Sequence, residues 1–183
     1  MKNKAYNLAT YIFSSGEPLL LDANIWLFLF PAPSGKPSGS RASYSAAFKE
    51  MLKVGVYLAL DALVLSEYLN RYCRIEWNVL HKLAYPDFKN FRKSPEYVSV
   101  GNGAAVFARS ILKFCTKHDH PFSSTDVERV LTDFECGACD FNDGLFVETC
   151  RLNSWKFVTN DADFTNGGIE VLTSNPKLLT ACS

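Results

Sequence analysis

The stretch Pro18–Phe28, PLLLDANIWLF, places a carboxylate, Asp22, directly after three leucines. The short apolar run Leu19–Leu21 predicts a strand buried on both faces, as in a parallel sheet. Burying an unpaired carboxylate is costly, so either a partner pairs with Asp22 or the strand ends where a cation can bind. Asp22 also suits the N-cap of a helix starting at Ala23, and the stretch alone leaves these explanations open.

The rest of the chain alternates between helical and strand patterns. Helices are predicted near 42–53, along an apolar stripe from Leu65 to Ile75, near 107–115, and after residues 125 and 140. Strands are predicted just before the second of these helices, at 156–159 and at 169–173. This alternation indicates a parallel sheet with helices on both faces. A length of 183 residues suits one domain, 1–183, with a core of about 18–174.

Local signals predict the boundaries of several segments. Residues 1–17 are predicted to be a lead-in, and residues 31–39 a turn-rich loop. Thr125-x-x-Glu128 has the pattern of a capping box. Asp140 suits the N-cap of the next helix, with Asp143 in its first turn, and His118 and His120 are expected to end a solvated helix.

Composition excludes some classes of protein. The formal net charge is zero, which argues against a chain that coats nucleic acid by charge alone. Six scattered cysteines in a chain of this length do not suggest a disulfide framework. Asn7 and Thr10 interrupt the apolar segment near the start, and no apolar run approaches the roughly 20 residues of a membrane span. We therefore expect a cytoplasmic protein that does not interact with a membrane.

Acidic residues from distant segments are expected to meet at one edge of the sheet. Ligands of open α/β sheets bind outside the carboxyl ends of the strands. Asp22, Asp161 and Asp163 follow predicted strands, Asp143 begins a helix, and Glu67 lies near the start of another. Oxygen ligands select hard cations such as Mg²⁺ or Mn²⁺. Five neighbours are candidates to orient the carboxylates or waters, although local backbone bonding or capping explains them equally well or better: Asn24, Ser66, Asp140, Asn142 and Thr159.

Three blocks of the sequence, LLLDANIW, LVLSEYLNR and DFNDGLFVETCRLNSWKFVTNDADF, resemble the signature blocks of PIN-domain ribonucleases in order and spacing. The resemblance covers about residues 18–174. It implies a three-layer αβα sandwich with a central, mostly parallel sheet, and a ribonuclease that depends on Mg²⁺ or Mn²⁺. The positions that match the family's acidic quartet are Asp22, Glu67, Asp143 and an acid of TNDADF, for which Asp161 is favoured and Asp163 is a supporting ligand.

Metal-assisted hydrolysis of a phosphodiester bond is the mechanism that this resemblance implies. Asp22, Asp143 and Asp161 would bind one or two metal ions, and Glu67 would orient a metal-bound water or complete a second site. Many bacterial members of the family are toxins of VapC-type toxin–antitoxin pairs, so a small antitoxin is an expected partner beside the RNA substrate. We also expect a homodimer.

Two other functions remain open. A strand ending in Asp also occurs in phosphatases of the haloacid-dehalogenase type, where Asp22 would be the nucleophile. The pattern of those enzymes has a second Asp two residues after the nucleophile, whereas this chain has Asn24 at that position. The other alternative is a non-catalytic module that keeps the fold and binds a protein, against which the intact acid set argues.

Two motifs lie outside the acid set. Cys136 and Cys139 have the spacing of half a zinc site, but no second pair follows. The segment Tyr85–Lys93, YPDFKNFRK, interleaves aromatic residues with Lys89, Arg92 and Lys93. This pattern suits single-stranded RNA, although an ordinary loop with half-buried aromatic side chains explains it slightly better.

Overall fold

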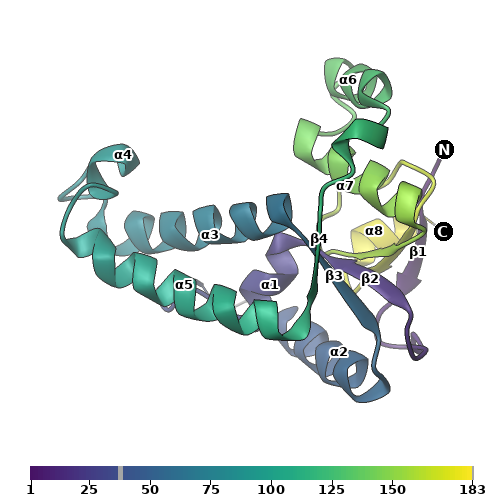
Figure 1. The fold of residues 1–183 in the computed structure, drawn as a ribbon, viewed down its shortest axis with the longest axis horizontal. Coiled ribbons are helices and arrows are strands. Elements are labelled where there is room, and N and C mark those ends of the chain that lie inside the picture. Colours follow the sequence, from purple (N-terminus) through teal and green to yellow (C-terminus); the bar gives the residue numbers. More distant parts are fainter. Residues whose placement is uncertain (37–38, 183) are drawn as a thin grey trace.

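A computed structural model describes residues 1–36 and 39–182. Its strands form one sheet in the order β1-β6-β5-β2-β3-β4, and every neighbouring pair is parallel (Figure 1). In these described residues the strands are β1 (Lys4–Asn7), β2 (Pro18–Leu21), β3 (Tyr57–Asp61), β4 (Thr116–His118), β5 (Lys156–Val158) and β6 (Glu170–Thr173).

Helices make up most of the remaining structure. The α-helices are α1 (Ala23–Leu29), α2 (Arg41–Val54), α3 (Ala62–Glu76), α4 (Phe88–Phe91), α5 (Glu96–Phe114), α6 (Val127–Glu135), α7 (Phe141–Asn153) and α8 (Pro176–Ala181). A π-helical turn, Trp77–His81, extends α3, and a 3₁₀ turn, Phe122–Ser124, precedes α6.

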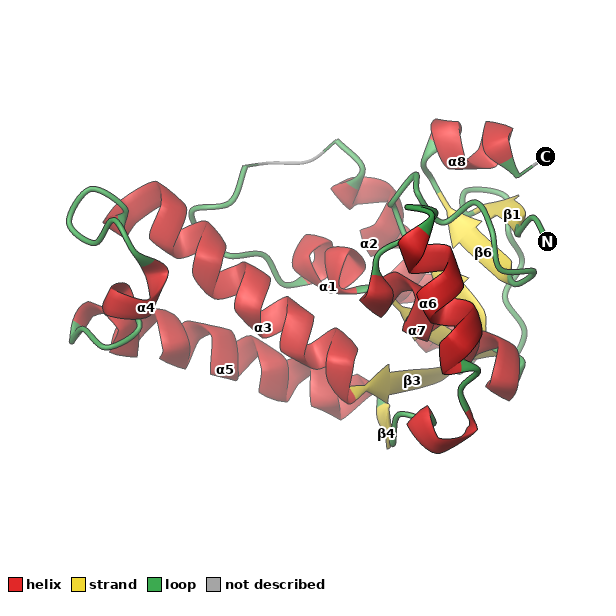
Figure 2. Ribbon diagram, turned by 90° about the horizontal axis from the view of Figure 1, so that it is seen from above, coloured by secondary structure: helices red, strands yellow, loops and turns green. Residues whose placement is uncertain are grey.

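The direction of the crossovers places these helices in two layers. The connections β2-α1-α2-β3 and β3-α3-α4-α5-β4 both move one way along the sheet, whereas α6 and α7 return the chain from β4 to β5. Because such connections are right-handed, the two groups cover opposite faces. The predicted three-layer αβα sandwich is therefore confirmed. Helices α3 and α5 also extend beyond the sheet as a hairpin with α4 at its tip (Figures 1 and 2).

The central strand has the burial that its sequence predicts. Leu19, Leu20 and Leu21 are at most 1% exposed. Strand β2 lies between β3 and β5, with Leu20 in register with both Ala59 and Phe157. Burying each leucine contributes about 1.5–3 kcal/mol. This strand therefore anchors the position of Asp22.

The prediction that residues 1–17 are only a lead-in is wrong. Strand β1 pairs with β6 at the edge of the sheet, and Leu8 joins the hydrophobic core. The buried side chain of Asn3 donates to the carbonyl of Phe164 at 3.1 Å and accepts from the backbone N–H of Ile169 at 3.0 Å. The segment is too short and polar to show a clear strand pattern, and pairing with β6 determines its conformation.

We expect Asn3→Ala to lower the free energy of unfolding by about 1–3 kcal/mol, because it leaves the buried N–H of Ile169 without its partner and the Phe164 carbonyl with only the weak contact from the Cys182 thiol. Urea denaturation followed by circular dichroism measures this change. The control is Asn102→Ala on the exposed side of α5, which should be neutral or slightly stabilising. Equal stability of Asn3→Ala and wild type would contradict a structural role for β1.

Three local predictions also need correction. His118 lies in β4 and not in a helix, and the Nδ1 atom of His120 lies 2.8 Å from a carboxylate oxygen of Asp61, across β3. The N-cap of α6 is Asp126, which accepts from the backbone N–H of Arg129, whereas the Thr125 hydroxyl donates to the Pro121 carbonyl. The Asp126 carboxylate, one residue later, therefore takes the capping position that was predicted for the Thr125 hydroxyl.

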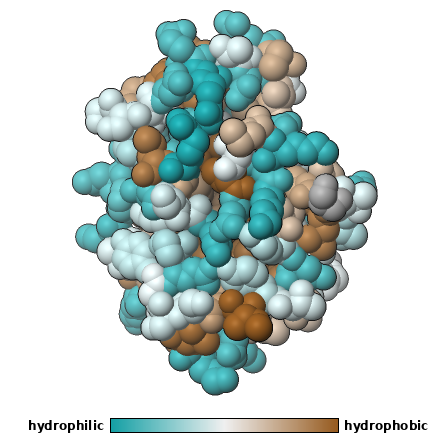
Figure 3. Space-filling model, turned by 90° about the vertical axis from the view of Figure 1, so that its right-hand side faces the viewer, coloured by the Kyte–Doolittle hydropathy of each residue, from teal (hydrophilic) through white to brown (hydrophobic). Residues whose placement is uncertain are grey.

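The predicted loop at 31–39 has neither helix nor strand at 31–36 and 39, and positions 37–38 lie outside the described residues. In the described part of the chain, no helix combines the length and the apolar character needed to cross a membrane. Hydrophilic side chains cover most of the end opposite the hairpin tip, with hydrophobic ones in separate small areas (Figure 3).

Candidate metal centre at the edge of the sheet

The sheet has a topological switch point between β2 and β5. From this point the crossovers leave in opposite directions, which opens a crevice at the carboxyl edge where α/β proteins bind ligands. Asp22 directly follows β2 and Thr159 directly follows β5. The backbone N–H of Asp22 donates to the carbonyl of Val158 at 3.0 Å, so the two strand ends are held together.

Asp22 is both a helix cap and a residue of this crevice. One carboxylate oxygen accepts from the backbone N–H of Asn24 at 3.2 Å and caps α1. The other accepts from the Thr159 hydroxyl at 2.6 Å and from the Asn24 side-chain amide. The two explanations of Asp22 from the sequence are therefore compatible, and the strand end has hydrogen-bond donors but no buried cation of its own among the described residues.

Burial makes Asp22 costly to ionise. The carboxyl group is only 4% exposed, and this desolvation raises its pKa from the usual 3.8 to about 6. Hydrogen bonds from Thr159 and Asn24 lower the pKa, the charge of Glu67 raises it, and the charge of Arg71 lowers it. The balance leaves a carboxylate whose charge is incompletely compensated at neutral pH.

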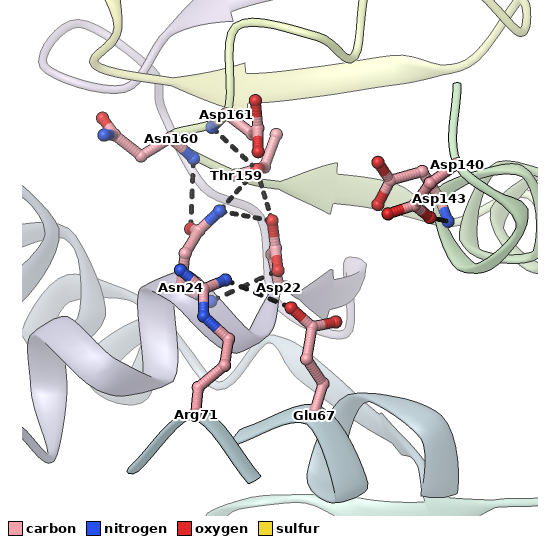
Figure 4. A network of polar contacts seen from close by, with 9 residues as sticks. All are labelled: Asp22, Asn24, Glu67, Arg71, Asp140, Asp143, Thr159, Asn160 and Asp161. Carbon is pink, nitrogen blue, oxygen red and sulfur yellow. Dashed lines mark hydrogen bonds and ion pairs between the residues drawn. The ribbon is translucent and has the colours of Figure 1, made fainter. Parts of the chain in front are cut away.

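Glu67 and Arg71 approach Asp22 from α3. The Arg71 guanidinium donates to the Glu67 carboxylate at 3.1 Å, one helical turn away. Both side chains point toward Asp22 and Asn24 (Figure 4). Arg71 therefore supplies the positive charge nearest to the acids drawn there, and it is a functional candidate that was not predicted from the sequence.

Asp143 completes the cluster from the opposite layer. It lies in the first turn of α7, which Asp140 caps by accepting from the Asp143 backbone N–H at 2.9 Å. Burial raises the pKa of the Asp143 carboxyl to about 7. Four further carboxylates add to this rise by repulsion, those of Asp140, Asp22, Asp161 and Glu67. The charges of the other three predicted acids, Asp22, Glu67 and Asp161, thus act on Asp143, and we refer to these four residues as the acid cluster.

The acid cluster supplies suitable donor atoms, but these atoms do not surround a common ion position. Among residues 1–36 and 39–182, no three His, Cys, Asp or Glu side chains are close enough together to form a ready-made metal site. The donor chemistry does fit a hard divalent cation, because it is made of carboxylate oxygens, and the charges of the other acids raise the pKa of Asp143. Binding would require Glu67, Asp143 or Asp161 to move toward Asp22.

The two acids of TNDADF have different surroundings. Asp161 is partly buried, and its backbone N–H donates to the Thr159 hydroxyl at 3.0 Å. Its carboxylate accepts from the backbone N–H of Asp163 and acts electrostatically on Asp143. Asp163 is exposed and lines a separate cavity beside Asp143. Asp161 is therefore the better placed fourth acid.

The predicted neighbours of the acids divide into two groups. Asn24 and Thr159 contact Asp22 directly, and the Asn24 amide also donates to the Thr159 hydroxyl at 3.2 Å. Ser66 and Asn142 are exposed, and no contact between either side chain and the acids is found in the described structure. Adjacent residues of a helix point about 100° apart, so sequence proximity to Glu67 or Asp143 does not bring a side chain into the crevice.

Two residues that the sequence reasoning missed hold the loop after β5. The Asn160 backbone N–H donates to the Asn24 side-chain oxygen at 3.3 Å. The buried hydroxyl of Tyr44, on α2, donates to the Thr159 carbonyl at 3.0 Å. An aromatic residue on an apolar helix face carries no signal in the sequence for such a polar role.

A groove runs from the acid cluster between α1, α3 and the residues before the undescribed segment. Its volume is about 540 Å³, and Asn24, Arg71 and Asp161 line the end next to the cluster. Apolar side chains such as Leu27 and Ile75 also line it, together with further polar groups. The groove therefore offers both cationic and apolar contacts to a ligand that reaches the acids.

The other motifs do not form metal sites. Cys136 is exposed, Cys139 is partly buried, and the described structure contains no third ligand that would complete a site with them. Glu148, on α7, is buried and forms ion pairs with Arg129 and Arg151. Arginine side chains thus neutralise the charge of Glu148, one of the acids between 121 and 150, whereas the described structure shows no ion pair for Asp143.

No protein-family model matches this chain. No curated protein matches it either. Among solved structures, the crystal structure of PAE2754 from Pyrobaculum aerophilum is similar, with 15% identical residues and a TM-score of 0.44 over 88% of this chain and 89% of that chain.

Proposed function

We propose that this protein is a metal-dependent endoribonuclease of the PIN-domain type. The observation that supports it best is that the charges of Asp22, Glu67 and Asp161, from three separate segments, raise the pKa of Asp143 on a fourth segment, near the switch point of a parallel sheet. Structural acids normally have cations as partners, as Glu148 does. This cluster contains one arginine and several acids, which favours a role in holding a cation.

The residues divide the work in this proposal. Asp22, Asp143 and Asp161 would hold Mg²⁺ or Mn²⁺, whose chemistry would be to activate a water and to neutralise charge on the phosphate. Asn24 and Thr159 keep the Asp22 carboxylate in one orientation by donating to it. Glu67 would orient a water, and Arg71, which donates to Glu67 and lines the groove, would contact a phosphate.

Single-stranded RNA is the substrate class that the groove favours. Its mixture of apolar and cationic side chains suits unpaired bases beside a phosphate backbone. We further propose that the protein is cytoplasmic, with the thiols reduced, since the described cysteines are all free. An antitoxin partner and a homodimer belong to the same proposal, and co-purification with the product of a neighbouring gene and light scattering test them.

Cleavage of internally labelled single-stranded RNA by purified protein tests the function. We expect shorter RNA products with Mg²⁺ or Mn²⁺ and none with EDTA. A phosphatase of the haloacid-dehalogenase type would instead release inorganic phosphate from a phosphate monoester and leave the RNA length unchanged. A protein that cleaves neither substrate under any metal condition would support the non-catalytic binding module.

We expect Arg71→Gln to strengthen Mn²⁺ binding by about 2–5-fold, because the guanidinium competes with the ion for the acids and an exposed pair contributes up to about 1 kcal/mol. Isothermal titration calorimetry measures the affinity, and Arg109→Gln on the exposed side of α5 is the control. Weaker Mn²⁺ binding by Arg71→Gln alone would show that Arg71 positions Glu67 for the ion.

A further inference from the structure

Positive charge is concentrated in the hairpin that extends beyond the sheet. Residues 71–93 contain six lysines and arginines and two acids. One of these acids, Glu76, is buried, and its carboxylate accepts from the backbone N–H and hydroxyl of Ser34 at 2.8 and 3.0 Å. Residues 121–150, on the other side of the acid cluster, have seven acids and one base. The exposed surface of the hairpin is therefore electropositive.

A basic notch lies near the tip of this hairpin, where α3 meets α4. It has a volume of about 470 Å³, and its polar lining includes Asn70, Arg74, Asp87, Lys89 and Arg92. The carboxylate of Asp87 accepts from the backbone N–H groups of Lys89 and Asn90 at 2.7 and 3.1 Å, as the N-cap of α4. Its charge opposes an anion, but the three cations outnumber it.

Aromatic side chains hold the basic notch in shape. The Arg74 guanidinium lies 4.6 Å from the centre of the Phe88 ring, and this ring packs edge-on against Trp77 at 5.5 Å. The Trp77 indole N–H donates to the Tyr85 carbonyl at 2.7 Å. Phe91 is fully buried beneath them. These rings form a small core, so stacking on Phe91 is not open to a base, and the groups of the notch that can bind a ligand are its cations.

Arg74, Lys89 and Arg92 are free to bind an anion. In the described structure, none of the three has a carboxylate within ion-pair distance. Lys93 is exposed and lies outside the notch. Arginine and lysine at fixed positions beside an amide side chain match the oxygens of phosphate groups.

The basic notch and the acid cluster lie along the same helix. Glu67, Arg71 and Arg74 occur at intervals of four and three residues, so they share one face of α3. At 1.5 Å per residue, Glu67 and Arg74 are about 10 Å apart along the axis. Figures 1 and 2 show α4 at the end of α3 that is remote from the sheet.

We propose that the basic notch binds backbone phosphates of the single-stranded RNA that flanks the cleavage position, so that the strand runs along α3 from the acid cluster to the hairpin tip. The inference rests on the proposed ribonuclease function. Contacts to phosphate carry no base specificity, so the notch contributes affinity and register for long RNA and does not select its sequence.

Fluorescence anisotropy with labelled RNA tests this proposal. Measurements use the Asp22→Asn background, so that bound RNA stays intact. The two RNAs have about 5 and about 15 nucleotides, lengths that lie within the known range of single-strand site sizes. We expect Lys89→Gln/Arg92→Gln to weaken binding of the longer RNA about tenfold or more. The slope of log K against log salt should become shallower by about 0.7 for each phosphate that the variant no longer neutralises, and binding of the shorter RNA should stay the same.

The control is Arg109→Gln/Lys113→Gln, which removes the same charge from exposed positions of α5 in the same hairpin. Equally weakened binding in both double variants would overturn the proposal, because net charge alone would then explain it. The assignment to RNA would also be overturned if poly-glutamate bound as tightly as the longer RNA and if Lys89→Gln/Arg92→Gln abolished that binding. Wild type that binds long RNA through Lys89 and Arg92 but never cleaves it would support the basic notch and contradict the ribonuclease. Wild type that cleaves RNA, but whose binding of long RNA does not depend on Lys89 and Arg92, would support the ribonuclease and contradict the basic notch.

Discussion

Asp22→Asn is expected to reduce metal-dependent RNA cleavage by at least about 100-fold, which exceeds the usual effect of losing an outer-shell partner. The substitution keeps the shape of the side chain and its bond from the Thr159 hydroxyl, but it removes the most buried charge of the cluster. A time course of RNA cleavage with Mg²⁺ or Mn²⁺ measures the reduction. Asp119→Asn, an exposed position, is the control and should keep wild-type activity.

The same variant should be as stable as wild type in EDTA at pH 8, or about 1–2 kcal/mol more stable. A pKa of about 6 in place of 3.8 means that the ionised Asp22 costs the apo fold about 3 kcal/mol, because each pKa unit corresponds to about 1.4 kcal/mol. Loss of the bond from the Asn24 backbone N–H to the other oxygen offsets about 1 kcal/mol of the gain. A clearly destabilised variant with full activity would show that Asp22 is only a helix cap.

The sequence was sufficient for the parts of the fold that depend on local pattern. The buried leucine run, the strands on both sides of Asp161 and the cap at Asp140 all follow from periodicity and capping chemistry. Strand β1 could not be found in this way, because four partly exposed residues become a strand only by pairing with β6. The same holds for His120, whose position depends on Asp61 in the neighbouring strand β3, 59 residues earlier in the chain.

The sequence predicted which acids belong to the candidate site, but it did not predict how their side chains are arranged. Residues that follow parallel strands must meet at one edge, so Asp22 and Asp161 could be placed together from their order alone. The position of Arg71 over Asp22 depends on how α3 crosses α1, and the anchoring of the loop after β5 depends on Tyr44 from α2. Such contacts between layers leave no spacing in the sequence. Ser66 and Asn142 were candidates only through their position beside Glu67 and Asp143, and the described structure shows no contact between their side chains and the acids.

A saturating concentration of Mn²⁺ should raise the melting temperature at pH 8 by about 5–10 °C. An ion at 100 times its dissociation constant adds about 2.7 kcal/mol, and 1 kcal/mol moves the melting temperature of a domain of this size by about 2–4 °C. The acids that repel one another in the apo protein would gain a common counter-charge. Differential scanning fluorimetry measures the shift, and Asp22→Asn should lose most of it.

This stabilisation should disappear by about pH 5, and the direction follows from the two raised pKa values. Carboxyl groups with pKa values of about 6 and 7 in the fold, against 3.8 in the unfolded chain, bind more protons when folded. Without metal, their contribution to stability is therefore largest below about pH 4 and is lost as the pH rises through 6 and 7. With metal the order reverses, because at pH 5 the ion must displace protons from both Asp22 and Asp143, whereas at pH 8 both are already ionised. An equal rise at pH 5 and pH 8, or an equal rise in Asp22→Asn, would place the ion elsewhere on the molecule and remove the main support for a metal centre at this edge of the sheet.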